Sequence, residues 1–287
     1  MRLATFLYHN TPVLGLIRGE RSEGVVAIPG LTIWDVIEHG PIALADLRAI
    51  DRPAVAYQLA DLLSPLPALR RNVMCLGHNY AEHAKESAEA RGRAVKLPDY
   101  PIFFTKATHT LNGPYASIPY DASVSDQIDW EAELAVIIGR RGRNIAAAEA
   151  LNHVFGYTVV NDVSARDLQF NHGQFFKGKS LDGACPMGPW IVTADEVPDP
   201  HALAIRCRVN GVLKQSASTG DMIFKIPAII ESLSRGLTLE PGDVIATGTP
   251  SGVGFARTPP EFLKPGDVVE CEVEGIGLIR NTVGAAA

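Results

Sequence analysis

Two patterns of hydrophobic and polar residues divide the chain. Residues 1 to about 70 contain short alternating apolar runs, which predict strands over 3–8, 13–17 and 24–28 and then a helix over 32–39. Pro65, Pro67 and the pair Arg70-Arg71 follow and indicate a linker. We therefore predict a small N-terminal α+β domain over residues 1–70 and a larger domain over residues 71–287.

The larger segment is dominated by strand-like runs rich in Val and Ile. Turn signals such as Asn210-Gly211 separate these runs, and helices are predicted only over 80–89, 145–154 and 226–234. The predicted strands lie at 73–76, 102–105, 133–138, 157–161, 190–193, 204–209, 244–246 and 268–273. This pattern favours a β-rich α+β fold over an alternating βαβ sheet.

Composition and charge are typical of a globular protein and exclude several kinds of partner. Of the 287 residues, 46% are hydrophobic and 20% are charged, and the net charge is -6. Lys and Arg are scattered, so we expect neither nucleic acid nor a membrane as a partner. The four cysteines form no CxxC pair, which argues against a zinc site or a disulfide framework. Because neither a signal peptide nor a transmembrane span is apparent, we expect a cytoplasmic protein.

Three acidic residues are candidates for a cation site. Glu131 and Glu133 begin a predicted strand, where alternation places them on one face about 7 Å apart. Such a pair needs a cation, a shared proton or full solvation, because neighbouring carboxylates repel. Asp162 follows another apolar run. The alternatives are a solvated strand end for the glutamates and a turn or helix cap for Asp162; if the three converge, they suit Mg²⁺, Mn²⁺ or Ca²⁺.

Four stretches of the sequence together resemble the fumarylacetoacetate hydrolase family, over residues 72–282. In order, they are 77–86 (GHNYAEHAKE), 129–134 (DWEAEL), 161–169 (NDVSARDLQ) with 177–180 (KGKS), and 247–254 (TGTPSGVG). The resemblance implies a mixed β-roll of the C-terminal catalytic type in this family, a homodimer, Mg²⁺ or Mn²⁺ as cofactor, and a substrate with a 2-oxo acid end. It also implies that Glu131, Glu133 and Asp162 bind the metal.

The remaining stretches supply candidate catalytic and substrate-binding residues. His83 and Glu86 are three residues apart, so on a helix the carboxylate can orient and polarise the imidazole. An exposed helical histidine is the alternative. The resemblance instead implies a dyad that activates water or moves a proton, and a lid over residues 84–97 that brings the dyad over the metal when substrate binds. Lys179 matches the family's lysine near the metal, while Lys106 matches a motif without an assigned role. Gln169 is a further candidate catalytic residue, which can hydrogen-bond a substrate oxygen or water. Arg166, Gly248 and Thr249 are the candidate substrate-binding residues, although Arg166 equally suits a salt bridge and the glycine-rich turn equally suits a plain turn.

The leading functional prediction is metal-dependent hydrolysis of a C–C bond in a 2,4-dioxo acid of the acylpyruvate type. The dyad of His83 and Glu86 deprotonates water, and the metal and Lys179 stabilise the pyruvate-like enolate that leaves. The alternatives share this enolate: an isomerase or decarboxylase of a 2-hydroxymuconate-like or oxaloacetate-like acid, or a hydrolase of a sugar-derived 2,4-dioxo-3-deoxy acid. A non-catalytic, cation-stabilised module that binds small acids is disfavoured, because a purely structural site needs neither the dyad nor Lys179.

Overall fold

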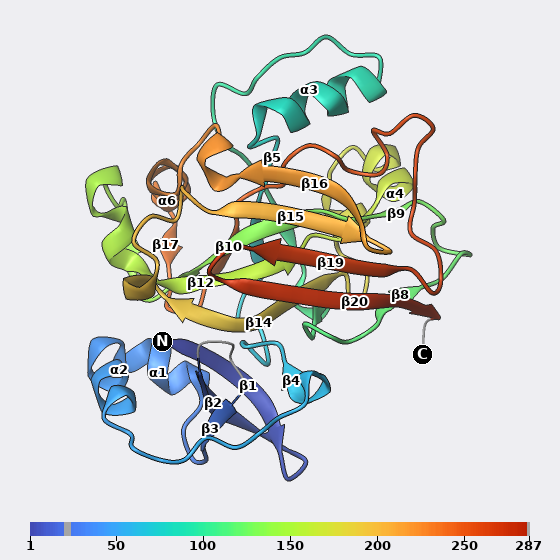
Figure 1. Ribbon diagram of the computed structural model, residues 1–287. Coiled ribbons are helices and arrows are strands. Elements are labelled where there is room, and N and C mark those ends of the chain that lie inside the picture. Colours follow the sequence, from blue (N-terminus) through green and yellow to red (C-terminus); the bar gives the residue numbers. More distant parts are fainter. Residues whose placement is uncertain (20–23, 286–287) are drawn as a thin grey trace.

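The computed structural model describes residues 1–19 and 24–285 and contains two sheets that pack against each other (Figure 1). The larger sheet has 11 strands. Its main path runs β3 (Gly24–Ile28), β2 (Thr11–Arg18), β1 (Arg2–Tyr8), β14 (Cys185–Thr193), β12 (Val154–Asn161), β10 (Ala132–Ile138), β18 (Val244–Ala246), β5 (Val73–Gly77) and β6 (Ile102–Lys106). Two short strands lie off this path: β4 (Leu62–Leu63) pairs with β1, and β7 (Leu111–Asn112) pairs with β14.

The smaller sheet has five strands and lies across one face of the larger sheet. Its order is β16 (Val212–Ser218), β15 (Ala204–Val209), β19 (Val268–Val273), β20 (Gly277–Ala285) and β8 (Ile118–Tyr120). Two further pairs are β11 (Gly142–Arg143) with β17 (Thr238–Leu239) and β9 (Ile128–Asp129) with β13 (Ser164–Ala165). The expectation of a strand-rich mixed fold is thus confirmed.

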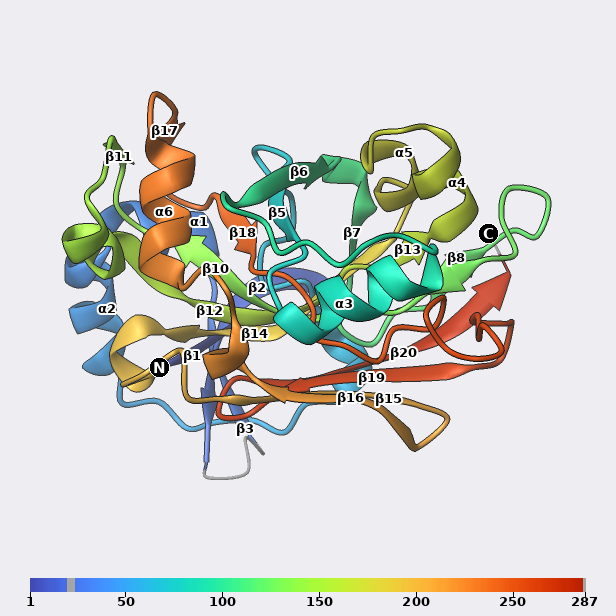
Figure 2. The same cartoon turned by 90° about the horizontal axis from the view of Figure 1, so that it is seen from above.

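Six α-helices and several 3₁₀ segments surround the sheets in the described part of the chain (Figure 2). The helices are α1 (Ile33–His39), α2 (Pro41–Arg48), α3 (Ala81–Ala90), α4 (Arg166–Asn171), α5 (Phe176–Lys179) and α6 (Ile226–Ser234). The 3₁₀ segments are Leu59–Asp61, Thr108–Thr110, Ala147–His153, Ala194–Glu196 and Thr219–Asp221. In the described residues, no helix combines the length and apolar character that crossing a membrane requires.

Strand β10 lies at the centre of the fold and is buried on both faces. Leu134 and Val136 belong to the apolar core that the two sheets share, whereas Ala135 and Ile137 face the second core, beneath α1 and α2. All seven of its residues are buried. This explains the nearly continuous apolar run after Glu133, which a strand solvated on one face would not have.

The N-terminal segment extends the larger sheet. Strand β1 pairs antiparallel with β14, with Leu3 opposite Ile191. Helices α1 and α2 contribute Val36 and Leu47 to the second core, which also includes Ala135 of β10. The elements of residues 1–70, in blue in Figure 1, therefore pack directly on the larger part. The domain boundary near residue 70 stays a prediction.

Some local predictions were wrong, and the causes are identifiable. The predicted helix over 145–154 is instead a 3₁₀ segment, Ala147–His153, that leads directly into β12. Helix α2 was missed, although Pro41 is at its first turn, a position that proline favours. The edge strand β16 was missed because its sequence, VLKQSAS, lacks a regular hydrophobic alternation.

Candidate active site

The pairing of β10 with β12 brings the three predicted carboxylates together. Ala132 is opposite Asn161 in the antiparallel ladder, so Glu131 and Asp162 lie just beyond this pair, at adjoining ends of the two neighbouring strands. The backbone N–H of Asp162 donates to the carbonyl oxygen of Glu131 at 2.8 Å, and the Asn161 side chain accepts from the N–H of Glu131 at 3.0 Å. One oxygen each from Glu131, Glu133 and Asp162 consequently lies within 4.8 Å of the others.

Burial rules out the solvated alternatives for these carboxylates. Glu131 is 5% exposed, and Glu133 and Asp162 are 0% exposed. Asp162 does precede β13 and α4, but its carboxylate accepts hydrogen bonds from lysine side chains and does not cap the helix. Buried carboxylates need compensating charge or hydrogen bonds, because removing them from water is costly.

Two lysines and one arginine compensate part of this negative charge. The ammonium group of Lys179 lies 2.7 Å from Glu131 Oε2 and 2.7 Å from Asp162 Oδ2. Lys106 Nζ donates to the other oxygen, Asp162 Oδ1, at 2.7 Å. Arg166 Nη2 lies 2.7 Å from Glu131 Oε1. Burial alone would raise the pKa of Glu131, but Lys179 and Arg166 outweigh it and lower that pKa.

Glu133 is the carboxylate that this network leaves uncompensated. Its Oε2 accepts from the backbone N–H of Gly248 at 2.7 Å, but no donor in the described residues reaches Oε1, which is buried. Burial, together with Asp162 and Glu131, raises its pKa well above the usual range. A buried, unpartnered carboxylate oxygen beside two other carboxylates fits a hard divalent cation such as Mg²⁺ or Mn²⁺.

The predicted dyad is formed on α3. His83 Nδ1 lies 2.9 Å from Glu86 Oε1, and the backbone N–H of Gly252 donates to both oxygens of Glu86, at 3.0 and 2.9 Å. A carboxylate can only accept, so in the neutral imidazole Nδ1 carries the proton and Nε2 has the free lone pair. His83 is 6% exposed, so it is not the exposed helical histidine of the alternative reading.

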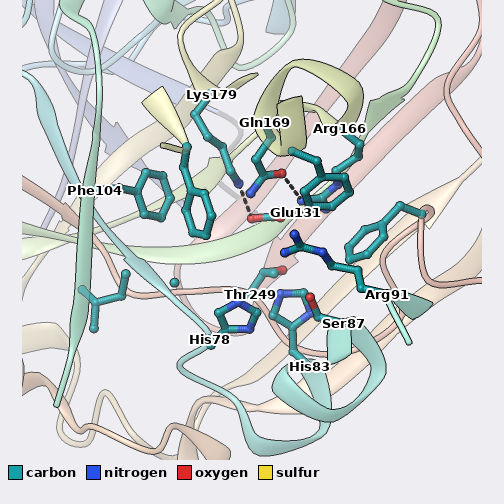
Figure 3. Close-up of a pocket in the computed structure, with 15 residues that line it drawn as sticks. His78, His83, Ser87, Arg91, Phe104, Glu131, Arg166, Gln169, Lys179 and Thr249 are labelled. Atoms are coloured by element: carbon teal, nitrogen blue, oxygen red, sulfur yellow. Dashed lines mark hydrogen bonds and ion pairs between the residues drawn. The ribbon is translucent and has the colours of Figure 1, made fainter. Parts of the chain in front are cut away.

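His83 of the dyad and Glu131 of the carboxylate triad line one pocket from opposite sides (Figure 3). His83 and Ser87 of α3 line one side of this pocket. Glu131, Gln169 and Lys179 line the other side. The fold thus brings His83 and Lys179, about a hundred positions apart in the sequence, to the same pocket.

The predicted substrate contacts have partners of their own within the protein. Arg166 donates to Asp129 Oδ2 at 2.8 Å and to Gln169 Oε1 at 3.0 Å, so its salt bridge is real and it also orients Gln169. Gly248 donates its N–H to Glu133, while the Thr249 hydroxyl donates to the carbonyl of Ala132 at 2.9 Å. This turn therefore positions a carboxylate ligand. Substrate binding by Arg166, Gly248 and Thr249 stays a prediction.

Sequence reasoning missed several residues of the site. Lys106, to which no role was assigned, is fully buried against Asp162. His78 has a positive φ of 52° and its ring stacks on His83, with centroids 5.7 Å apart; burial and His83 lower the pKa of His78 to about 4. Arg91 also lines the pocket. His83, Ser87 and Arg91 follow one another at intervals of four, a helical spacing that is visible in the sequence.

The strand-rich fold combines a buried carboxylate triad, an ammonium group hydrogen-bonded to it and a histidine–glutamate pair, an arrangement that suits metal-assisted acid–base chemistry. The sequence profile of the family described as Fumarylacetoacetate (FAA) hydrolase C-terminal matches residues 72–284. The chain therefore belongs to the fumarylacetoacetate hydrolase family, as the four stretches predicted.

Relatives with assigned activities include tautomerases and a hydrolase. Oxaloacetate tautomerase YisK of Bacillus subtilis (strain 168) is 48% identical over 230 residues, 79% of this chain and 75% of that protein. The mitochondrial oxaloacetate tautomerase FAHD2B of Bos taurus is 45% identical over 257 residues, which is 88% of this chain and 79% of that protein. The maleylpyruvate hydrolase of Sphingobium sp. SYK-6, solved with manganese(II) and pyruvate, has a TM-score of 0.81 at 30% identity and full coverage of both chains. The names of the two tautomerases favour the isomerase alternative over the leading prediction of hydrolysis.

Proposed function

We propose that this protein interconverts the keto and enol forms of an oxaloacetate-like 2-oxo acid with the help of Mg²⁺ or Mn²⁺. The observation that carries this proposal is the pocket in which Glu131 of the carboxylate triad and Lys179 lie opposite the imidazole of His83. The names of the tautomerase relatives support the choice of substrate.

His83 is the group that moves the proton. Its Nδ1–H is held by Glu86, so Nε2 accepts a proton from C3 of the keto form. The electron pair of that C–H bond forms the C2–C3 double bond, and the carbonyl electron pair moves onto the C2 oxygen. The imidazolium then returns the proton to this oxygen, which completes the enol and regenerates neutral His83. Glu86, fixed by Gly252, stabilises the imidazolium while the proton is held.

Two sources of positive charge would stabilise the negative charge that develops on the C2 oxygen. Glu131, Glu133 and Asp162 would hold a divalent cation, which would supply Lewis-acid stabilisation of an enolate. Lys179 adds a charge-assisted donor beside these ligands, and burial gives its charge more weight than it would have in water. Asp162 and Glu131 outweigh the effect of burial and raise the pKa of Lys179, which keeps it cationic.

Hydrolysis of a 2,4-dioxo acid is the second candidate, because a neutral His83 beside Glu86 can equally deprotonate a water. The likeness to the maleylpyruvate hydrolase also favours it. The two reactions differ in what becomes of the C–C bond, since tautomerisation leaves the carbon skeleton intact.

One assay separates these candidates. The enol form of oxaloacetate is mixed with protein and Mg²⁺, and the loss of its ultraviolet absorbance is followed together with release of pyruvate; acetylpyruvate is tested in parallel for release of acetate. We expect metal-dependent loss of the enol faster than pyruvate release, no cleavage of acetylpyruvate, and loss of catalysis in His83→Ala. Glu82→Ala, at an exposed position of the same helix, is the control. Cleavage of acetylpyruvate without tautomerisation of oxaloacetate would replace the proposal by hydrolysis.

A further inference from the structure

Three cationic side chains line the pocket, and the protein neutralises two of them. Lys179 is held between Glu131 and Asp162, and Arg166 is paired with Asp129 and Glu131. The third cation, Arg91, pairs with no carboxylate of the described residues. The pocket therefore presents one guanidinium group whose charge no acidic side chain balances.

Packing directs Arg91 into the pocket. The residue ends α3, one helical turn after Ser87 and two turns after His83, and its guanidinium group points inward beside the dyad (Figure 3). The guanidinium carbon lies 4.4 Å from the ring centre of Phe170. Phe170 in turn packs edge-on against Phe255, at 5.4 Å between centroids.

This arrangement leaves the hydrogen-bonding edge of the guanidinium available. Stacking on an aromatic ring uses the face of the group, while its N–H bonds lie in the plane and point away from the ring. Arg91 is half-buried, and burial together with Arg93 lowers its pKa, without any acidic group to offset either effect. An anionic ligand in the pocket would supply the missing charge, and a carboxylate matches the fork of donors.

We propose that Arg91 binds the second carboxylate of a dicarboxylic 2-oxo acid and so selects diacids over monocarboxylic 2-oxo acids. The inference rests on the proposed function, in which the first carboxylate and the 2-oxo group lie at the site of Glu131, Glu133 and Asp162. A substrate with an apolar tail would leave Arg91 unpaired in a partly desolvated pocket, which is unfavourable. With the first carboxylate at the metal site, the same contact would place the C3 methylene, which lies between the two ends, near His83, which lines the pocket together with Arg91.

The test compares ligands that differ only in the second carboxylate. Isothermal titration calorimetry of the Mg²⁺-loaded protein measures the binding of malate and of 2-hydroxybutanoate, in which a methyl group replaces that carboxylate. Neither ligand needs to react. Steady-state kinetics with enol-oxaloacetate gives kcat and KM separately. The variants are Arg91→Gln, Arg91→Lys, and Arg93→Gln as the matched control, since Arg93 is exposed and does not line this pocket.

We expect Arg91→Gln to weaken malate binding at least about tenfold and to leave 2-hydroxybutanoate binding unchanged. KM for oxaloacetate rises by a similar factor, with a smaller change in kcat. Arg91→Lys restores part of the preference, and Arg93→Gln matches the parent protein. Equal weakening of both ligands, or none of either, overturns the role of Arg91. If the parent protein does not tautomerise oxaloacetate, the proposed function fails, while the binding comparison still decides the role of Arg91.

Discussion

The substitution Glu133→Gln distinguishes a metal-binding role of Glu133 from a structural role, because the two roles predict opposite changes in the stability of the metal-free protein. Glutamine keeps the size of the side chain and an acceptor for the N–H of Gly248. It removes the negative charge and places an amide donor where Oε1 has no partner in the described residues. If Glu133 has a structural role, Glu133→Gln destabilises the metal-free protein. If Glu133 is a metal ligand, the substitution reduces stability only when the metal is present.

The magnitudes follow from the distances in the site. One oxygen of each carboxylate lies within 4.8 Å of the other two, and at an effective dielectric constant of about 20 each like-charge pair costs about 3.5 kcal/mol. Lys179 and protonation of Glu133 relieve part of this repulsion. We therefore expect Glu133→Gln to stabilise the metal-free protein by about 1–3 kcal/mol. In the parent protein, Mg²⁺ at 100 times its Kd adds about 2.7 kcal/mol, or roughly 5 °C in Tm.

Thermal unfolding with EDTA and with Mg²⁺ measures both effects on the same samples. The parent protein gains Tm on addition of Mg²⁺, while Glu133→Gln starts at a higher Tm with EDTA and gains little. Glu149→Gln, an exposed glutamate, is the control for loss of one negative charge. The reasoning is refuted if Glu133→Gln lowers the Tm in EDTA, or if the variant retains the full increase with Mg²⁺.

Three further changes test other parts of the account. Lys179→Met leaves two buried carboxylates without their shared donor, so we expect a loss of about 3–5 kcal/mol in urea unfolding of the metal-free protein; an unchanged midpoint contradicts the network. Gly178→Ala places a Cβ 2.4 Å from the backbone nitrogen of Gln169, so stability and turnover should both fall, which circular dichroism and the enol assay measure. Burial lowers the pKa of His201, whose Nε2 accepts from the N–H of Ile226. The folded protein favours the neutral ring, so stability is complete above about pH 6.5 and declines as the pH falls through the lowered pKa. Urea unfolding of His201→Gln should lack this part of the decline.

The positions of the strands, and the placement of Glu131 and Glu133 on one face of a strand, were predictable from the sequence because each depends on a local pattern of residues. An apolar run such as 134–138 predicts a buried strand whichever partners it has. The placement of Glu131 and Glu133 follows from alternation, and the four stretches linked them to Asp162 and the dyad. That all three carboxylates are buried could not be predicted from alternation, because it depends on the register of β10 with β12.

Long-range partners account for most of what the sequence did not reveal. Lys106 reaches Asp162 from β6 across 56 residues, and no local pattern distinguishes it from a solvated lysine. The sequence placed Arg91 only within the lid predicted over residues 84–97, and its inward direction is set by its contact with Phe170. The 3₁₀ segment over 147–153 likewise follows from its packing against α6, which a propensity-based prediction cannot include.

The central claim is that His83 moves a proton at C3 of a 2-oxo diacid when a divalent cation is present. Proton NMR of oxaloacetate in D₂O tests it directly, because each cycle of tautomerisation exchanges a C3 proton for deuterium. The account predicts protein-dependent exchange in Mg²⁺ that exceeds the rates of spontaneous exchange and of decarboxylation. EDTA, Glu133→Gln and His83→Ala each abolish this exchange, while Glu82→Ala does not. Exchange that persists in His83→Ala, or no exchange by the parent protein in Mg²⁺, would contradict it.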